Sequence, residues 1–365
     1  MRAKEMKEYI DYLNNVGGKV LLGCDGFVDE VYQIVKVRQS LSEYSAMDRL
    51  RDFGELIVAR QDGGVGLEIV PKRRCSGGFT PNTGRVAAFL GLKPTLIGLY
   101  GEKDIDSAFE EFVDNCELIS LGDPALTLVL EFLDGKVLMS ALKTVADLTW
   151  KDVSARIGEA KLRELFTEVD ILGLGYWSLT PDFDRFLEGF VSQYERGKGP
   201  RRMFFDFADI NKKSPQSLTE TIELMSRLNE KIPMTISFNE HEGKELFSRF
   251  SLKMHEDPQT VAADLTSLRK ETGIDEIIIH TPHFAAVSHS TEGEAHAMQE
   301  TQSKVIRTAG AGDTFNGGYL CASLGDLPLK ERLVIANAAT AFFVTHATAP
   351  NKEEMIAQIE QASDR

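Results

Sequence analysis

The most informative segment of the chain is Thr308-Ala309-Gly310-Ala311-Gly312-Asp313-Thr314-Phe315-Asn316-Gly317-Gly318, and the residues after it favour a helix of small and apolar side chains. A loop of small residues that opens a helix lets backbone N–H groups converge on an anion, and the helix dipole adds partial positive charge. An aspartate at this point can accept a proton from an attacking hydroxyl while the amides hold a phosphoryl group. A tight turn capped by Asp313 would look the same, so the rest of the chain has to separate the two interpretations.

The composition indicates an acidic globular protein. Hydrophobic residues make up 42% and charged residues 27% of the 365 residues, and the formal net charge is −15. Nucleic acids and anionic membranes require a basic face, so neither is expected as a partner, whereas a small anionic substrate can still bind in a locally positive pocket. The four scattered cysteines are typical of reduced thiols in a cytoplasmic protein. Residues 1–15 predict a polar amphipathic helix rather than a signal peptide, and no apolar run has transmembrane length.

Short apolar runs alternate with helical patterns along most of the chain. The predicted strands are 19–23, 94–100, 170–174, 202–206, 234–238 and 276–280. The predicted helices between the later strands are 155–167, 182–196, 215–229 and 259–272. This alternation favours one large α/β domain with a mainly parallel sheet and helices on both faces.

A β-hairpin interrupts the alternation. The β-rich runs 126–132 and 136–143 are joined by Asp134-Gly135, which is a strong hairpin signal. Because a hairpin does not fit the rhythm of a doubly wound sheet, we expect it to form a small secondary sheet. Such a sheet could serve as a lid over a crevice.

Polar and glycine residues stand where a crevice is expected. Asp25 and Asp29 follow the first predicted strand, and in open parallel sheets the ligand crevice lies at the carboxyl ends of the strands. They could contact a polyhydroxylated ligand or simply form turns. Gly77 and Gly78 allow close backbone approach before a helix, in whose first turn Asn82 could bond a hydroxyl or act as an N-cap.

Three further polar residues follow later strands. Asn239 and Glu242 have the spacing of a capping box, and the functional alternative places Glu242 near magnesium-bound water or phosphate. Thr281 follows the strand 276–280 and is a candidate nucleotide contact. An alanine-rich helix over 332–345 is expected to pack beside the helix that begins at Gly312.

The order of these features resembles the ribokinase-like (pfkB) carbohydrate kinase family over roughly residues 19–351. Gly-Ala-Gly-Asp within 308–318 is the most specific element, followed by Gly77-Gly78 with Asn82 and then by Asn239 to Glu242. The resemblance implies one ribokinase-like domain over residues 1–365, with a mainly parallel central sheet, helices on both faces and a small β lid. Segments of about 28–40 and 124–145 would contribute that lid.

The resemblance also implies an activity, namely a sugar kinase that transfers the γ-phosphoryl group of Mg-ATP to a hydroxyl of a carbohydrate or sugar-like acceptor. Asp313 would be the catalytic base, and the amides of Gly310, Ala311 and Gly312 would form the anion hole. The acceptor would be held by Asp29, Gly77, Gly78 and Asn82, with Asp25 as a weaker candidate. Asn239 and Glu242 would serve the magnesium–phosphate end, with Glu242 acting through water, and Thr281 and Asn337 would lie near the nucleotide.

Some residues depart from the family pattern. The family commonly has an acidic residue where Arg307 stands, which puts monovalent-cation dependence in doubt. His280-Thr281 is somewhat similar to the ADP-dependent sugar kinases of the same superfold, but those chains are usually longer, so ATP is the preferred donor over ADP. The remaining alternatives are a nucleoside kinase of the same superfold and a catalytically silent regulator that binds a sugar or nucleotide. The family also includes homodimers formed through the lid.

Overall fold

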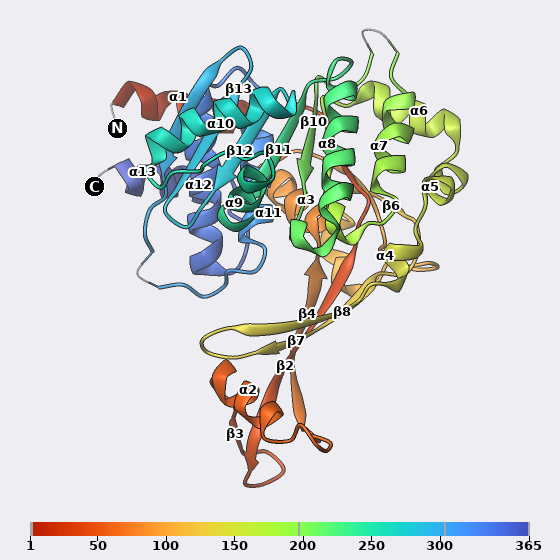
Figure 1. Ribbon diagram of the computed structural model, residues 1–365, viewed down its shortest axis with the longest axis vertical. Helices are drawn as coiled ribbons and strands as arrows, with labels where there is room; N and C mark the ends of the chain where they lie inside the picture. The colour runs from red at the N-terminus through yellow and green to blue at the C-terminus, as the bar shows by residue number, and fades with distance from the viewer. Residues whose placement is uncertain (1–2, 196–197, 303, 364–365) are drawn as a thin grey trace.

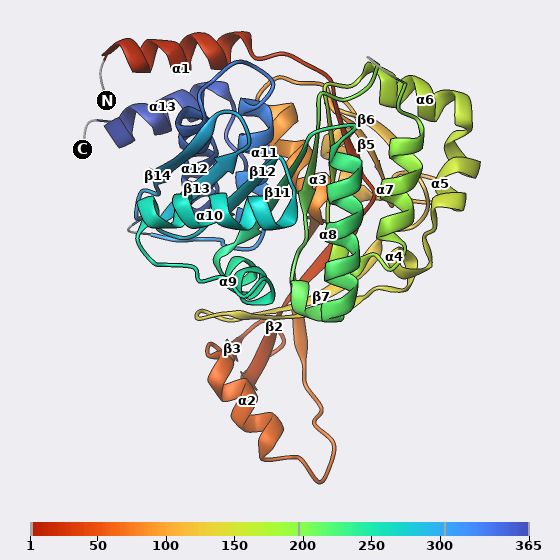
Figure 2. The same cartoon turned by 45° about the horizontal axis from the view of Figure 1, so that its top comes forward.

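Two sheets of different size organise the computed structural model, which describes residues 3–195, 198–302 and 304–363 (Figure 1). The large sheet is covered by helices, and the small sheet extends from it toward the bottom of the view. Figure 2 shows the same two parts after a turn of the molecule. Among the described residues, no helix combines the length and the apolar character needed to cross a membrane.

The large sheet has nine strands within the described residues. Their order across the sheet is β14 (Gly293–Met298), β13 (Phe284–His289), β12 (Glu276–His280), β11 (Met234–Asn239), β10 (Arg202–Asp206), β9 (Ile171–Leu174), β1 (Val20–Gly23), β5 (Thr95–Gly98) and β6 (Glu117–Ser120). The strands from β12 to β6 pair in parallel, and β13 and β14 are antiparallel additions at one edge. The predicted mainly parallel sheet is therefore confirmed.

Helices cover both faces because neighbouring side chains of each strand point in opposite directions. In β12, Ile277 and Ile279 belong to one hydrophobic core, and Ile278 belongs to the other. The first core is covered by α5 (Trp150–Ile157), α6 (Glu159–Glu168), α7 (Phe183–Ser192), α8 (Pro215–Asn229), α9 (Glu240–Arg249) and α10 (Pro258–Thr272). The second is covered by α1 (Ala3–Asn15), α3 (Phe79–Phe89), α11 (Ala311–Ala322), α12 (Leu329–His346) and α13 (Lys352–Ser363).

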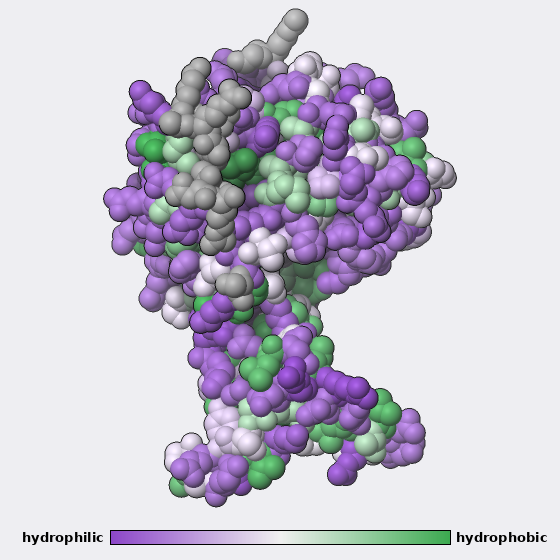
Figure 3. Space-filling model, turned by 90° about the vertical axis from the view of Figure 1, so that its left-hand side faces the viewer, coloured by the Kyte–Doolittle hydropathy of each residue, from purple (hydrophilic) through white to green (hydrophobic). Residues whose placement is uncertain are grey.

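The small sheet is built on one long strand, β2 (Phe27–Arg38). It pairs in parallel with β7 (Ala125–Glu131) and antiparallel with β4 (Ile69–Gly77) and β3 (Tyr44–Ala46), and β8 (Lys136–Ala141) completes the predicted hairpin with β7. Helix α2 (Leu50–Val58) packs on this sheet through a separate small core that contains Ile34 and Phe132. Figure 3 shows the small sheet and α2 projecting below the larger body of the molecule. The strands β3 and β4 and helix α2 extend the sheet beyond the segments predicted for a lid.

One local prediction was wrong. The single helix expected over 155–167 is divided into α5 and α6, because Gly158 adopts a backbone φ of 85° that ends the first helix. The segment between β5 and β6 contains a short 3-10 helix, Ser107–Phe112. The antiparallel pair β13 and β14 was not predicted at all.

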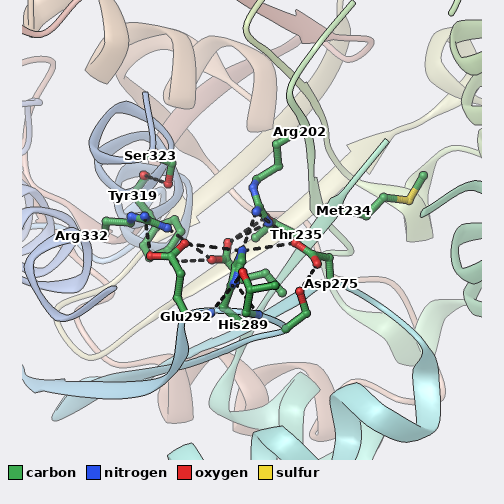
Figure 4. A network of polar contacts seen from close by, with 12 residues as sticks. Arg202, Met234, Thr235, Asp275, His289, Glu292, Tyr319, Ser323 and Arg332 are labelled. Carbon is green, nitrogen blue, oxygen red and sulfur yellow. Dashed lines mark hydrogen bonds and ion pairs between the residues drawn. The ribbon is translucent and has the colours of Figure 1, made fainter. Parts of the chain in front are cut away.

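A buried polar network joins the sheet to α11 and α12 at the amino ends of the strands (Figure 4). Glu276 is fully buried and accepts hydrogen bonds from the hydroxyls of Thr235 at 2.8 Å and Tyr319 at 3.0 Å. Its carboxylate also lies 3.6 Å from Arg202 and 3.8 Å from Arg332. Because Tyr319 belongs to α11, this network fixes the helix at the end opposite to Asp313.

Candidate active site

A cavity of about 420 Å³ lies between the two sheets at the carboxyl ends of the parallel strands. The large sheet and its loops contribute Tyr176 and Asp206, and the small sheet contributes Asp29, Thr127 and Ser140. This composition of carboxylates and hydroxyls suits a polyhydroxylated ligand. We call this space the acceptor cavity.

A second cavity of about 700 Å³ lies beside it, between α9, the turn after β12, residues 299–302, α11 and α12. We call it the donor cavity. The two cavities share Asn239, His280 and Gly312 as lining residues. They therefore meet beside the start of α11.

Asp313 lies at this meeting point, in the first turn of α11. The helix begins after Gly310, whose φ of 88° is readily adopted only by glycine. The buried Asp313 carboxylate accepts hydrogen bonds from Asn82 Nδ2 at 2.8 Å and from the Tyr176 hydroxyl at 3.3 Å. Burial raises the pKa of Asp313, and the two hydrogen bonds and the charge of Arg307 offset part of that rise. The result is an oriented carboxylate with greater affinity for a proton than an exposed aspartate.

The backbone N–H groups just before Asp313 differ in whether they already donate a hydrogen bond within the protein. The N–H of Ala311 donates to the carbonyl of Thr308 at 3.0 Å, so it closes the turn. Within the described part of the chain, the N–H groups of Gly310 and Gly312 donate to no protein acceptor. Both of these glycines line the acceptor cavity, and Gly312 lines the donor cavity as well. The two glycine amides are therefore better placed than Ala311 to bind an anion.

The predicted acceptor residues Asp29, Gly77, Gly78 and Asn82 all line the acceptor cavity. Arg85 donates to Asn82 Oδ1 at 3.0 Å, so the amide nitrogen of Asn82 must face Asp313. The glycines have a second role, because a Cβ at Gly77 would lie 3.0 Å from the carboxylate oxygens of Asp29. Glycine here leaves room for a carboxylate as well as for a ligand.

Asp25 does not line either cavity. Its buried carboxylate accepts the backbone N–H groups of Phe79 at 2.7 Å and Thr80 at 2.8 Å, which begin α3. Burial raises its pKa to about 6. Asp25 therefore positions the helix that carries Asn82, and the structure gives it no direct contact with the acceptor cavity.

Asn239 and Glu242 form the predicted capping box at the start of α9. Glu242 and Asp206 both line the acceptor cavity. Burial and the charge of Asp206 raise the pKa of Glu242 to about 8, and burial and the charge of Asp313 raise the pKa of Asp206 to about 7. Among the described residues, no group of three or more His, Cys, Asp or Glu side chains converges as a metal-ligand set. Two nearby carboxylates on a polar cavity nevertheless suit Mg²⁺, which keeps several waters and needs few protein ligands.

The two predicted nucleotide residues have different surroundings. Thr281 lines the donor cavity, but its hydroxyl accepts the N–H groups of His283 and Phe284 and stabilises the turn after β12. Asn337 does not line the cavity, because its amide donates to the carbonyls of Ala297 and Met298 on β14. Helix α12 does reach the donor cavity, one and two turns further along, through Thr340 and Val344.

Several lining residues were not predicted, namely Tyr176, Asp206, Lys212, His280 and Arg307. Asp206 is the last residue of β10, and Tyr176 follows β9. The rule that ligands bind at the carboxyl ends of parallel strands, applied to every strand, would have found both. Arg307 lines the acceptor cavity, with its guanidinium 5.3 Å from the Phe343 ring and its Nε bonded to the Ala309 carbonyl at 3.0 Å.

Comparison with known proteins identifies the family. Residues 6–362 match the family model of prokaryotic ketohexokinase. The chain belongs to this family. A ketohexokinase of Haloferax volcanii is 26% identical over 343 residues, which cover 93% of this chain and 90% of the relative.

Solved structures of the ribokinase family share the fold. Ribokinase of Arabidopsis thaliana, in complex with ribose and ATP, superposes with a TM-score of 0.62 at 16% identity, covering 94% of this chain and 98% of that one. Ribokinase of Thermotoga maritima has a TM-score of 0.61 at 18% identity, covering 94% and 99%. The predicted family and ribokinase-like fold are confirmed, and this member of the ketohexokinase family is a carbohydrate kinase, a phosphotransferase with an alcohol acceptor.

Proposed function

We propose that the protein transfers the γ-phosphoryl group of ATP, as its magnesium complex, to a hydroxyl of a ketohexose. One observation carries this proposal. The Asp313 carboxylate faces the acceptor cavity at the border that this cavity shares with the donor cavity. The family supplies the acceptor class, and the Arabidopsis ribokinase complex with ATP supports ATP as the donor.

Asp313 acts as the base in this mechanism. It takes the proton of the acceptor hydroxyl as that oxygen attacks phosphorus, while Asn82 and Tyr176 hold the carboxylate in position. The amides of Gly310 and Gly312 donate to the oxygens of the transferring group. A positioned donor of this kind contributes about 10²- to 10³-fold to kcat.

Glu242 and Asp206 would hold magnesium-bound water at the phosphate end of the acceptor cavity. Bound there, Mg²⁺ supplies positive charge to the phosphate oxygens. The raised pKa values of both carboxylates fit this assignment, because two buried carboxylates without a cation are costly to ionise together.

The small sheet acts as the lid. Thr127 of β7 and Ser140 of β8 line the acceptor cavity, so movement of this sheet toward the large sheet would exclude water, which competes as an acceptor. Leu126 and Met139 on the same strands are about half exposed, which supports a homodimer formed through the lid. Sedimentation equilibrium of the wild type and of a Leu126→Asp variant tests this assembly, and a monomeric wild type contradicts it.

The test of the activity is a panel of ketohexoses, aldoses and nucleosides, each assayed with Mg-ATP and Mg-ADP separately. We expect turnover with a ketohexose and ATP. The Asp313→Asn variant should lose about 10³-fold or more in kcat while its ATP Kd changes little, because only the proton acceptor is removed. Asp326→Asn is the matched control, since Asp326 is exposed beyond the far end of α11. A kcat for Asp313→Asn close to the parental value would refute the assignment of the base, and turnover only with nucleosides or only with ADP would refute the proposed substrates.

A further inference from the structure

His280 has no role in the mechanism above, yet it stands where the two cavities meet. It is the last residue of β12 and lines both cavities. Its ring packs on Phe315 of α11, with 4.8 Å between the ring centroids and 30° between the planes. The side chain therefore has a fixed orientation between the donor and acceptor cavities.

The ring edge lies against the loop that binds the anion. A Cβ atom placed on Gly312 would lie 3.2 Å from His280 Cε1 and 3.7 Å from Nε2. The Nε2 edge is thus close to Gly312, which also lines both cavities. A side chain at position 312 would crowd the imidazole. Glycine at this position therefore leaves room for the His280 ring, as well as allowing a ligand to approach the backbone.

Both ring nitrogens of His280 are without a hydrogen-bonding partner in the described part of the chain. Other histidines differ, because His289 bonds Arg202 and His255 bonds Asp264. Burial lowers the pKa of His280 to about 4, so the ring is neutral at pH 7 and carries one N–H donor. The side chain is half-buried and lines both cavities, so a ligand oxygen at their border can reach this donor.

We propose that His280 is a further catalytic residue, whose Nε2–H donates a hydrogen bond to an oxygen of the phosphoryl group as that group moves from the donor to the acceptor cavity. This inference rests on the proposed function. The imidazole keeps its proton throughout, so no bond to hydrogen is made or broken at His280. A neutral donor suits this place, since an imidazolium would pair with the carboxylates of Asp206, Glu242 and Asp313 that face the acceptor cavity.

Two substitutions separate donation from packing. His280→Phe keeps an aromatic ring on Phe315 but removes both nitrogens, and His280→Gln keeps an N–H donor but loses the ring. Donation predicts that His280→Phe lowers kcat about 10²-fold with the ketohexose KM within twofold, and that His280→Gln recovers at least tenfold of that loss. A packing role predicts the reverse order. His296→Phe is the control, because His296 lies on β14 and lines neither cavity.

The outcomes distinguish this inference from the proposed function. Wild-type protein that phosphorylates no sugar in the panel removes the proposed function, whereas an active wild type with an equally active His280→Phe variant overturns only the role of His280. If His280→Phe fails to fold, the ring nitrogens of the wild type are followed by long-range ¹H–¹⁵N spectra. We expect the His280 nitrogen signals to shift when Mg-AMPPNP and the ketohexose are added together, and unchanged signals would overturn the inference.

Discussion

Removing the Asn82 amide should raise the pKa of Asp313 and move the acid limb of the pH profile to higher pH. Asn82 donates to the Asp313 carboxylate at 2.8 Å in a buried setting, and this bond is the largest of the effects that lower the pKa of Asp313 against its burial. The bond favours the ionised form, which is the form that can act as a base. Losing it therefore leaves a larger fraction of Asp313 protonated and inactive at a given pH.

The size of the shift follows from the bond. A hydrogen bond to a charged group contributes about 1.5–3 kcal/mol, and one pKa unit corresponds to about 1.4 kcal/mol, so Asn82→Ala should raise the pKa by about one to two units. The Tyr176 hydroxyl is further away, at 3.3 Å, and donates a weaker bond. Tyr176→Phe should therefore shift the same limb by less than one unit.

The assay is kcat/KM for the sugar between pH 5 and pH 9, because this ratio reports ionisations of the free enzyme. The nucleotide ionises identically with all variants, so only differences between them are interpreted. Asn82→Ser, which keeps a shorter donor, replaces Asn82→Ala if that variant is too slow to measure. The reasoning is refuted if Tyr176→Phe shifts the limb more than Asn82→Ala, or if neither variant shifts it.

Other perturbations test the glycine loop, the buried network and the metal end. Gly78→Ala should lower the free energy of unfolding by roughly 1–3 kcal/mol or more and raise the sugar KM, because Gly78 has a φ of 106° and a Cβ there would lie 2.4 Å from a carboxylate oxygen of the buried Asp25. Thermal unfolding measures the loss, and Gly64→Ala, where a Cβ would meet open space, is the control. Glu276→Ala should lower the free energy of unfolding by about 3–5 kcal/mol while kcat of the folded enzyme is retained, and the exposed Glu353→Ala should change it by less than about 0.5 kcal/mol. Glu242→Gln should raise the magnesium concentration for half-maximal activity about 10- to 100-fold at saturating ATP, and an unchanged value would remove Glu242 from the metal end.

The sequence was most informative where local and global signals agree. The strands 202–206 and 276–280 and the helix 215–229 were predicted with the bounds that the structure has. Apolar runs of strand length and a proline at the start of a helix are local signals that tertiary packing does not reverse. The antiparallel strands β13 and β14 were not predicted, because they form by pairing with β12 at the edge of the parallel sheet, and no local signal in the sequence reports that pairing.

The residues of the candidate site that stand in sequence motifs could be predicted, and those outside motifs could not. Asn82 and Asp313 are 231 residues apart, yet the structure joins them by one hydrogen bond. Tyr176 belongs to no motif that was recognised, and His280 was noted only as part of the His280-Thr281 pair. Both become candidate site residues only when folding brings the strand ends together. Asn337 shows a different difficulty. It lies on α12, which does line the donor cavity, but the packing of this helix against β14 decides which of its turns faces the cavity, and Asn337 bonds β14 instead.

Arg307 places a positive charge in the acceptor cavity of an acidic chain. The chain carries a net charge of −15, and the acceptor cavity is lined by Asp29, Asp206, Glu242 and Asp313 among others. A phosphoryl group would be repelled by these carboxylates unless positive charge stood near the anion-binding loop. Arg307 supplies that charge from a position fixed by the Ala309 carbonyl, and it lowers the pKa of Asp313 against the effect of burial. Arg307 therefore favours the ionised form of Asp313 and makes the border of the two cavities locally less negative, which a small anionic group requires in an otherwise acidic protein.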